Sequence, residues 1–170
     1  MSHNNIRKMT AVDLALVLSW RNHPDVRSYM YNQHEITMEE HRRWFEKNVD
    51  APGRHLLIFE IGANPMGFVN FTQLNQGGVV DWGFYLSPTA PKGSGRQLGK
   101  AALSYAFGYQ LFHKVCGQAL SYNERSINFH RRLGFQQEGL LRDQHFDGQQ
   151  HRSVVCFGLL RQEWNAGQEE

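Results

Sequence analysis

The feature that most limits the fold of this chain is a glycine-rich loop between a predicted strand and a predicted helix. The loop runs from Pro91 to Ala101 and reads PKGSGRQLGKA. Residues 79–86 (VVDWGFYL) are rich in β-branched and aromatic residues and predict the strand. Residues 97–112 predict the helix. The chain must therefore turn tightly from a strand into a helix at this point.

The loop has the composition of an anion-binding site. Its glycines allow positive φ angles and a close approach of the backbone to a ligand, and they are Gly93, Gly95 and Gly99. The first N–H groups of a helix have no acceptor inside the helix, so they can bind an anion. Three bases add positive charge: Lys92, Arg96 and Lys100. The loop predicts a phosphate or pyrophosphate site, and a simple strand-to-helix connector is the alternative.

The glycine spacing excludes two common phosphate-binding loops. A Walker A loop has a Ser or Thr after its lysine and four residues between its glycines, whereas three residues separate Gly95 from Gly99 and Ala101 follows Lys100. In a dinucleotide-binding loop the third glycine follows three positions after the second, whereas Gly99 follows four positions after Gly95. Such a loop also needs an acidic residue at the end of the next strand, and the predicted strand 114–120 ends without one. A coenzyme whose pyrophosphate rests on a helix N-terminus remains, and coenzyme A fits that description.

Composition favours one globular domain with a small-molecule partner. The chain has 170 residues, of which 41% are hydrophobic, so we expect a single domain over 1–170 with a core of about 5–165. A net charge of +2 is too small to favour nucleic acid or an anionic membrane. Cys116 and Cys156 lie in apolar runs and are expected to be reduced thiols. No signal peptide or membrane-spanning run is apparent, so the cytoplasm is the expected location.

Hydrophobic periodicity predicts a mixed α/β chain. Strands are expected at residues 6–9, 55–61, 66–74, 79–86, 114–120, 135–145 and 153–160. Helix starts are expected near Thr10, His23, Thr37, Gln97 and Glu124. The three strands before the glycine loop form an antiparallel meander, and a strand-helix unit follows the loop. This order predicts a mixed α/β sandwich, in which helices pack on a central sheet.

Three motifs accompany this order of elements: the loop over 92–99, the segment 123–135 (NERSINFHRRLGF) and a final strand over 157–164. With these motifs in this order, the chain resembles the GCN5-related N-acetyltransferase (GNAT) superfamily across essentially its whole length. The resemblance implies a mostly antiparallel sheet of about six or seven strands flanked by about four helices, with a splayed strand pair at the acetyl-CoA site. It also implies direct transfer of an acetyl group from acetyl-CoA to a primary amine in a ternary complex.

Two N-terminal segments narrow the resemblance. Residues 19–30 and 36–44 are similar to the N-acetyltransferases of pseudaminic acid biosynthesis. Those enzymes acetylate the 4-amino group of a UDP-linked dideoxy amino sugar, UDP-4-amino-4,6-dideoxy-N-acetyl-β-L-altrosamine, for flagellin glycosylation. An N-terminal protein acetyltransferase of the ribosomal-protein type is the alternative, and an acyl-CoA-binding regulatory module is a third class. The expected partner is a small-molecule amine, and the expected assembly is a monomer or homodimer.

The resemblance also implies roles for single residues. An alkyl ammonium must lose a proton before it attacks, and Asp81, where the family commonly has Glu, is expected to take it. Its shorter side chain favours a relay through water over direct contact. A solvated strand residue near a turn is the alternative. His130, seven positions after Asn123, lies where the family usually has the tyrosine that protonates the departing thiolate, and Tyr122 and Tyr85 are the substitutes. The residues expected to bind acetyl-CoA are Phe84, Leu86, Lys92, Gly93, Ser94, Gly95, Arg96, Leu98, Gly99, Lys100, Asn123 and Ser126.

The N-terminal helices are expected to supply most of the acceptor site. A nucleotide sugar could stack its uracil on an aromatic ring and pair its diphosphate with an arginine. The candidates are Trp20, Arg21, Tyr31, His41 and Tyr85, with a core role as the alternative for Trp20. The spacing of His34, Glu35 and His41 does not match a helical zinc motif, so no metal is expected.

Overall fold

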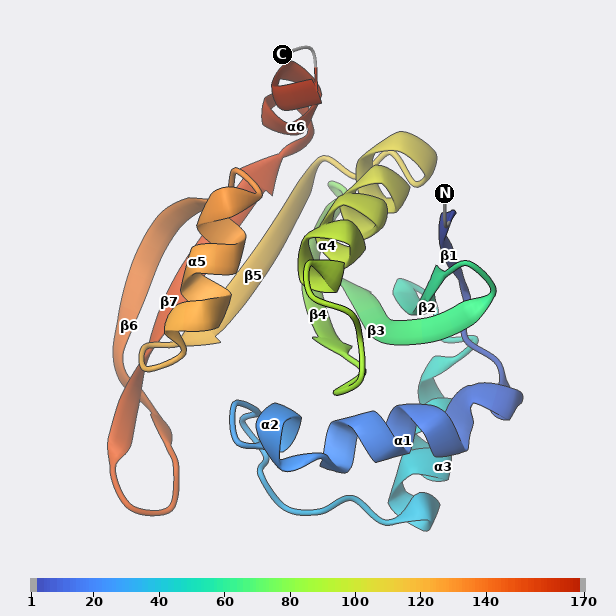
Figure 1. Cartoon of the computed structure of the whole chain (residues 1–170). Coiled ribbons are helices and arrows are strands. Elements are labelled where there is room, and N and C mark those ends of the chain that lie inside the picture. Colours follow the sequence, from blue (N-terminus) through green and yellow to red (C-terminus); the bar gives the residue numbers. More distant parts are fainter. Residues whose placement is uncertain (1–2, 169–170) are drawn as a thin grey trace. The chain divides into compact units, whose positions relative to one another are not determined.

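The computed structural model of the protein describes residues 3–168, which form a seven-stranded mixed sheet and six α-helices (Figure 1). The strands are β1 (Asn4–Lys8), β2 (Arg54–Ile61), β3 (Asn64–Gln73), β4 (Val79–Leu86), β5 (Lys114–Leu120), β6 (Gln136–Phe146) and β7 (His151–Leu160). The α-helices are α1 (Leu14–Asn22), α2 (Pro24–Arg27), α3 (Met38–Asn48), α4 (Ser94–Ser104), α5 (Glu124–Arg132) and α6 (Arg161–Gln168). The 3-10 turn η1 (Ala11–Asp13) precedes α1, and the π-helical turn η2 (Tyr105–Tyr109) follows α4.

β4 and β5 pair over only part of their lengths, at the place where the resemblance implied a splayed strand pair. The strand order is β1-β2-β3-β4-β5-β7-β6, and the pairs β1–β2, β2–β3, β5–β7 and β6–β7 are antiparallel. β4 and β5 are parallel, and their pairing covers only Val79–Asp81 against Lys114–Cys116. Both strands continue beyond this pairing, to Leu86 and Leu120. The predicted fold class is therefore confirmed.

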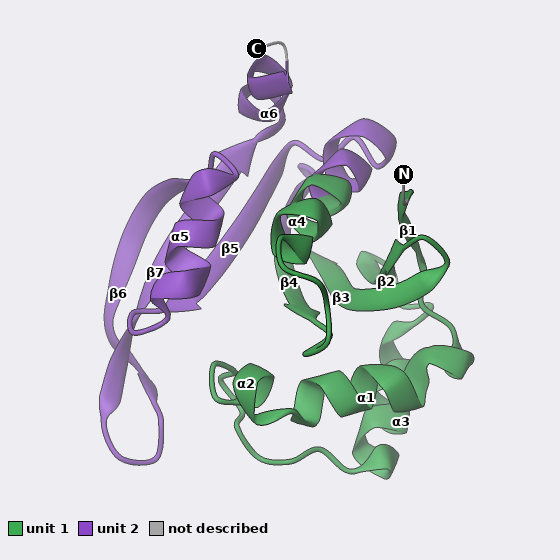
Figure 2. Ribbon diagram, in the orientation of Figure 1, with its two compact units in different colours: residues 1–73, 82–102 green, residues 74–81, 103–170 purple. Residues whose placement is uncertain are grey.

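The chain divides into two compact units (Figure 2). The first unit contains residues 1–73 and 82–102, and the second contains residues 74–81 and 103–170. β4 contributes to both, because residues 79–81 belong to the second unit and residues 82–86 belong to the first. The predicted single domain over 1–170 remains a prediction.

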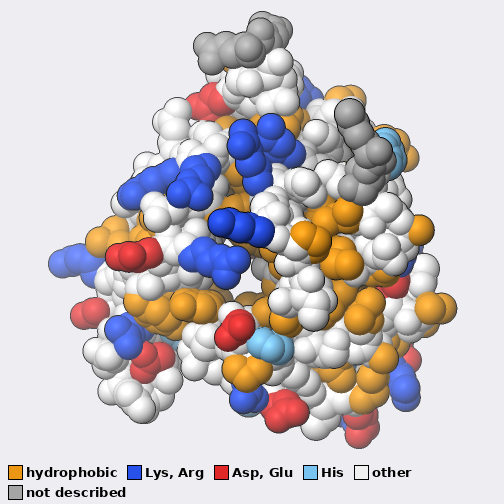
Figure 3. Space-filling view, in the orientation of Figure 1, with side chains coloured by type: hydrophobic (Ala, Val, Ile, Leu, Met, Phe, Trp, Pro, Cys, Tyr) orange, Lys and Arg blue, Asp and Glu red, His pale blue; other side chains and the backbone are white. Residues whose placement is uncertain are grey.

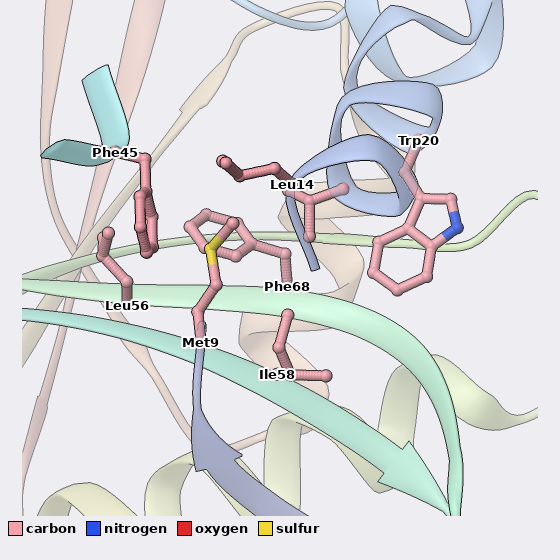
Figure 4. Close-up of a cluster of buried hydrophobic side chains, with 8 residues drawn as sticks. Met9, Leu14, Trp20, Phe45, Leu56, Ile58 and Phe68 are labelled. Atoms are coloured by element: carbon pink, nitrogen blue, oxygen red, sulfur yellow. The ribbon is translucent and has the colours of Figure 1, made fainter. Parts of the chain in front are cut away.

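The core of the first unit is a hydrophobic cluster that α1 and α3 form with β2 and β3 (Figure 4). Its members are Met9, Leu14, Val17, Trp20, Phe45, Leu56, Ile58 and Phe68. The α1 residues Leu14 and Val17 are three positions apart and therefore share one face of the helix. Burying each large apolar side chain contributes roughly 1.5–3 kcal/mol, so this cluster fixes α1 and α3 on the sheet.

Local sequence signals set the starts of two helices in the first unit. Thr37 and Glu40 form the predicted capping box of α3, because the Thr37 hydroxyl accepts from the Glu40 N–H (3.2 Å) and the Glu40 carboxylate accepts from the Thr37 N–H (2.7 Å). α2 begins with Pro24 in its first turn, as predicted after His23. These ends are confirmed because short-range hydrogen bonds determine them.

The core of the second unit lies between α5 and the strands β5 and β7. It contains the buried residues Val115, Ala119, His130, Phe135, Phe157 and Leu159. The β6–β7 hairpin turns at Gly148, which has a φ of 97°. Cys116 and Cys156 are free thiols, as expected, but both are half-buried on the strands.

Several predicted element bounds are wrong, among them both ends of the helix expected at 97–112, which ends at Ser104 and is followed by a π-helical turn to Tyr109. The helix after the glycine loop begins at Ser94 rather than at 97, so Gly95 and Gly99 belong to it. Residues 161–164 are not strand, because α6 begins at Arg161. The Glu163 carboxylate accepts from the Leu160 N–H (2.9 Å), and buried Trp164 packs against Phe107 with ring centroids 6.3 Å apart. This helix and the four-residue α2 raise the number of helices above the expected four or so.

Candidate active site

The glycine loop of the first unit leads into α4 with free backbone donors. Gly93 has a φ of 90°, and a Cβ there would meet no heavy atom within 4 Å. The Ser94 N–H and hydroxyl both donate to the Pro91 carbonyl, at 3.1 and 2.6 Å. Among the described residues, no backbone carbonyl accepts from the N–H groups of Gly95 and Arg96. These two donors in the first turn of α4 are available to an anion.

Exposed positive charge surrounds these donors. Lys92, Arg96 and Lys100 are exposed, and Arg96 and Lys100 are one helical turn apart on the same side of α4. Figure 3 shows basic side chains over α4. The positive end of the helix dipole adds to their attraction for an anion. The set fits a phosphorylated coenzyme, with the exposed Gln97 beside it.

Two loop residues have structural side chains. Ser94 is 2% exposed, and its hydroxyl is already bound to Pro91. Leu98 is fully buried, and its Cδ1 lies 2.6 Å from the position that a Cβ on Gly67 would take. Positive φ, expected at three glycines, occurs only at Gly93 because the others lie inside α4. Contact of Ser94 and Leu98 with the coenzyme remains a prediction.

The end of β4 in the first unit carries Phe84 and Leu86. Both side chains are half-buried, and the Phe84 ring packs against Trp82 with centroids 4.9 Å apart. The Ser87 N–H donates to the Met66 carbonyl (2.8 Å) and ties this end of β4 to β3. Contact of Phe84 and Leu86 with the pantetheine arm of the coenzyme remains a prediction.

Arg21, at the end of α1, is a half-buried guanidinium without a carboxylate partner among the described residues. Its Nη2 donates to the Asn32 carbonyl (2.5 Å), and its Nη1 is buried without a hydrogen-bond partner. Burial lowers the pKa of Arg21, the Tyr85 phenol opposes this shift, and Arg27 adds to it. A guanidinium stays charged at any physiological pH, so a bound anion would complete its interactions.

An aromatic row links Tyr85 to His41 within the first unit. The Tyr85 ring contacts Phe68 (5.2 Å between centroids), Phe68 meets Trp44 edge-on (5.7 Å), and Trp44 stacks on His41 (5.3 Å). Burial raises the pKa of Tyr85, so its phenol keeps its proton and can donate a hydrogen bond. His41 donates to the Leu14 carbonyl, and burial lowers its pKa, which leaves a neutral ring with a buried, unpartnered Nε2.

The other two predicted acceptor residues differ in burial. Trp20 is 3% exposed and belongs to the core cluster, which fits the alternative of a core anchor. Tyr31 is 50% exposed after α2. The first unit thus brings Arg21 close to Tyr85, while Trp20 is committed to packing.

Asp81 is the candidate base in the second unit. It lies opposite Cys116 in the short parallel pairing of β4 and β5. Its carboxylate has no hydrogen bond or ion pair with another described residue, and burial raises its pKa to about 6. A carboxylate with a raised pKa is a stronger base than an ordinary aspartate.

His130 lies on the buried face of α5. It is 1% exposed, its ring stacks on Phe157 (4.9 Å between centroids) and it meets Phe135 edge-on (5.0 Å). Its Nδ1–H donates to the Ser126 carbonyl (2.8 Å), and burial lowers its pKa to about 4. A ring that is neutral at pH 7 is a poor proton donor, so this environment favours packing over the predicted acid role.

The start of α5 uses two of the predicted coenzyme ligands in a helix cap. The Asn123 Oδ1 accepts from the Ser126 N–H (3.1 Å), which satisfies one of the first helical donors. The Arg152 guanidinium lies over the Tyr122 ring, with its Cζ 4.8 Å from the ring centroid. Contact between these residues and acetyl-CoA remains a prediction.

Sequence reasoning missed Asn70 on β3. This half-buried amide follows two positions after the core residue Phe68 in the strand segment GFVNF. A polar residue on the apolar side of a strand was the available signal.

Neither a metal site nor a membrane helix occurs in the described part of the chain. No group of three or more His, Cys, Asp or Glu side chains within residues 3–168 is arranged to hold a metal ion. None of the helices described is both long enough and apolar enough to cross a membrane.

The sequence of residues 5–136 matches the acetyltransferase (GNAT) domain family, and the protein belongs to that family. Among its relatives, the acetyltransferase PseH of Campylobacter jejuni serotype O:23/36 is 26% identical over 136 residues, which cover 77% of this chain and 82% of that protein. The PseH of serotype O:2 is 32% identical over 108 residues, covering 61% and 64%. The predicted superfamily and enzyme class are confirmed.

A solved structure confirms the fold. The spermidine N-acetyltransferase of Vibrio cholerae in complex with CoA and spermine has a TM-score of 0.88 to this chain at 20% identity, covering 95% of this chain and 98% of that one. At this level of identity the likeness concerns the fold alone. The acceptor must be inferred from the side chains of this protein.

Proposed function

We propose that the protein transfers the acetyl group of acetyl-CoA to the amine of a UDP-linked dideoxy amino sugar, at the 4-amino group used in pseudaminic acid biosynthesis. The observation that carries this proposal is the half-buried guanidinium of Arg21, which has no carboxylate partner among residues 3–168. A diphosphate supplies the anion that this guanidinium lacks, and Arg binds phosphate oxygens with two N–H groups at once.

The charge of Arg21 argues against a polyamine acceptor. Spermidine and spermine are cations, and a half-buried cation repels a second one more strongly than it would in bulk water. Relatives named PseH also match at 26–32% identity, whereas the Vibrio cholerae relative named spermidine N(1)-acetyltransferase matches at 21%. Both considerations favour the anionic sugar.

The glycine loop would hold acetyl-CoA. The N–H groups of Gly95 and Arg96 would bind the pyrophosphate, and the side chains of Lys92 and Lys100 would neutralise its charge. The reactive thioester needs no covalent enzyme intermediate, because the amine attacks its carbonyl carbon directly.

Asp81 would take the proton that the attacking amine loses. A carboxylate with a pKa of about 6 is mostly ionised at pH 7 and is a better base than an ordinary aspartate. As the N–C bond forms, this proton moves to the carboxylate, directly or through water. The C–S bond then breaks, and the CoA thiolate takes a proton from a tyrosine such as Tyr122 or Tyr85, or from water.

A mass-spectrometric acceptor screen with acetyl-CoA tests the proposal. The panel contains the UDP-4-amino sugar, spermidine and peptides with free N-termini. We expect the sugar to give the highest kcat/KM, and Arg21→Gln to raise the KM of the sugar by about 10- to 100-fold, since hydrogen bonds to a charged group contribute roughly 1.5–3 kcal/mol. Arg43→Gln is the matched control, because Arg43 is exposed on α3 and pairs with Glu39. Faster acetylation of spermidine or of a peptide would refute the proposal.

A further inference from the structure

The carboxamide of Asn70 lies in the space that a side chain at position 83 would fill. A Cβ on Gly83 would sit 2.6 Å from the Asn70 Oδ1 and 3.6 Å from its Cγ. Both residues belong to the first unit, Asn70 on β3 and Gly83 on β4. Only a glycine at 83 therefore leaves the Asn70 side chain in its present position.

Asn70 lies on the side of β3 that packs against α1 and α3, the helices that carry most of the acceptor candidates. Side chains alternate along a strand, so Asn70 shares a side with Phe68, whose ring contacts Tyr85 and Trp44. On the other side of β3, Gly67 makes room for Leu98 of α4, the helix that follows the glycine loop. Asn70 thus faces α1 and α3, where Arg21 and His41 lie, rather than the coenzyme helix.

The Asn70 amide makes no hydrogen bond to another described residue. Its direct neighbour on β2 is Leu56, which is 2% exposed and belongs to the core cluster. The side chain is half-buried, and its polar atoms are not among the fully buried unpartnered ones, so solvent or a ligand can reach them. Asn70 keeps a donor and an acceptor for a group outside the protein.

We propose that Asn70 is an acceptor-specificity residue that binds a neutral polar group of the acceptor, such as an acetamido group or a hydroxyl. A carboxamide offers one acceptor and two donors without net charge, which matches a secondary amide better than it matches a phosphate or an ammonium. Arg21 selects the charge of the acceptor, and Asn70 selects a neutral substituent. This inference rests on the proposed function and adds a second recognition point to its acceptor site.

The test is a double-mutant cycle between positions 70 and 83. Asn70→Ala should raise the KM of the acceptor about tenfold, because one lost neutral hydrogen bond changes binding by about that factor. Gly83→Ala should give a similar increase, since the new methyl group displaces the carboxamide. In the Asn70→Ala background, Gly83→Ala should add little, whereas independent effects would multiply to about a hundredfold. Asn64→Ala, an exposed position on the same strand, is the control.

Further measurements distinguish a role of Asn70 in acceptor recognition from a role in folding, and failure of this inference from failure of the proposed function. The KM of acetyl-CoA and the melting temperature should stay near the wild-type values in both single variants. A UDP-amino sugar without the acetamido group should lose affinity for the wild type and be insensitive to Asn70→Ala. If the wild type prefers spermidine, the proposed function fails, and the same cycle with spermidine decides whether Asn70 contacts the acceptor. Additive effects, or an unchanged acceptor KM in Asn70→Ala, would overturn the inference.

Discussion

Burial changes the acid–base chemistry of two side chains in opposite directions. Asp81 has a raised pKa because its carboxylate loses water without gaining a partner among the described residues. His130 has a lowered pKa because aromatic rings surround it. The family resemblance singled out both residues, but the direction of each pKa shift depends on which side chains pack around them. Asn70 escaped notice because its relation to Gly83 arises only when β3 and β4 lie side by side.

Replacing Asp81 should separate activity from stability. If its carboxylate takes the amine proton, Asp81→Asn should slow turnover by about 10²- to 10⁴-fold, with little change in acetyl-CoA affinity. Because the pKa rises from 3.8 to about 6, ionisation of this carboxylate destabilises the fold increasingly from about pH 4 to pH 6, and by roughly 3 kcal/mol above pH 6. The variant should therefore melt at a higher temperature than the wild type at pH 8, and at a similar one at pH 4. Turnover within about threefold of the wild-type rate would remove Asp81 from the mechanism.

At the scale of elements, bounds that rest on local hydrogen bonds were predictable and bounds that rest on tertiary contacts were not. The α3 start follows from Thr37 and Glu40, which are neighbours in the sequence. The strand β4 has the predicted bounds because its apolar and aromatic pattern is unambiguous. The helix α6 needs Trp164 to pack against Phe107, a residue far away in the sequence. The start of α4 was placed too late because glycines were assigned to the loop rather than to the helix.

The glycine loop can be tested with a pair of matched glycine variants. Gly93 and Gly62 both have positive φ, 90° and 61°, and a Cβ at either would meet no atom within 4 Å. Valine at either site should cost about 1–2 kcal/mol of backbone strain. Only Gly93→Val should also weaken acetyl-CoA binding, since it moves the N–H groups of Gly95 and Arg96.

Melting curves with and without the coenzyme measure this difference. A ligand at a hundredfold excess over its Kd stabilises the fold by about 2.7 kcal/mol. We expect acetyl-CoA to raise the melting temperature of the wild type and of Gly62→Val by the amount that this stabilisation implies, and that of Gly93→Val by much less. An equal response in both variants would place the coenzyme elsewhere.

At the scale of the whole molecule, the candidate roles are distributed over both units. The glycine loop, Arg21, Asn70 and Tyr85 belong to the first unit, and Asp81 and His130 belong to the second. The GNAT family match spans parts of both, from residue 5 to 136. The proposed activity therefore needs residues of both units, and protonation of a buried group in the second unit can change the stability of the chain.

His130 should make the protein sensitive to acid. Its pKa is lowered to about 4 in the folded protein, so its contribution to stability is complete above pH 6.5 and is lost as the pH falls from 6.5 to 4. The loss should be about 2 kcal/mol at pH 5. The raised pKa of Asp81 acts in the opposite direction below pH 6, so the wild type alone would hide part of the effect.

Comparing His130→Phe with the wild type isolates the histidine, because every other titrating group is common to both. Phenylalanine can keep the ring contacts with Phe157 and Phe135, and urea denaturation at pH 7.5 and 5 should show a smaller acid loss in the variant by about 2 kcal/mol. Because a neutral buried imidazole is a poor proton donor, we also expect the variant to turn over within about threefold of the wild-type rate. Parallel stability profiles would show that His130 titrates normally, and turnover slowed by about a hundredfold or more would restore it as the general acid.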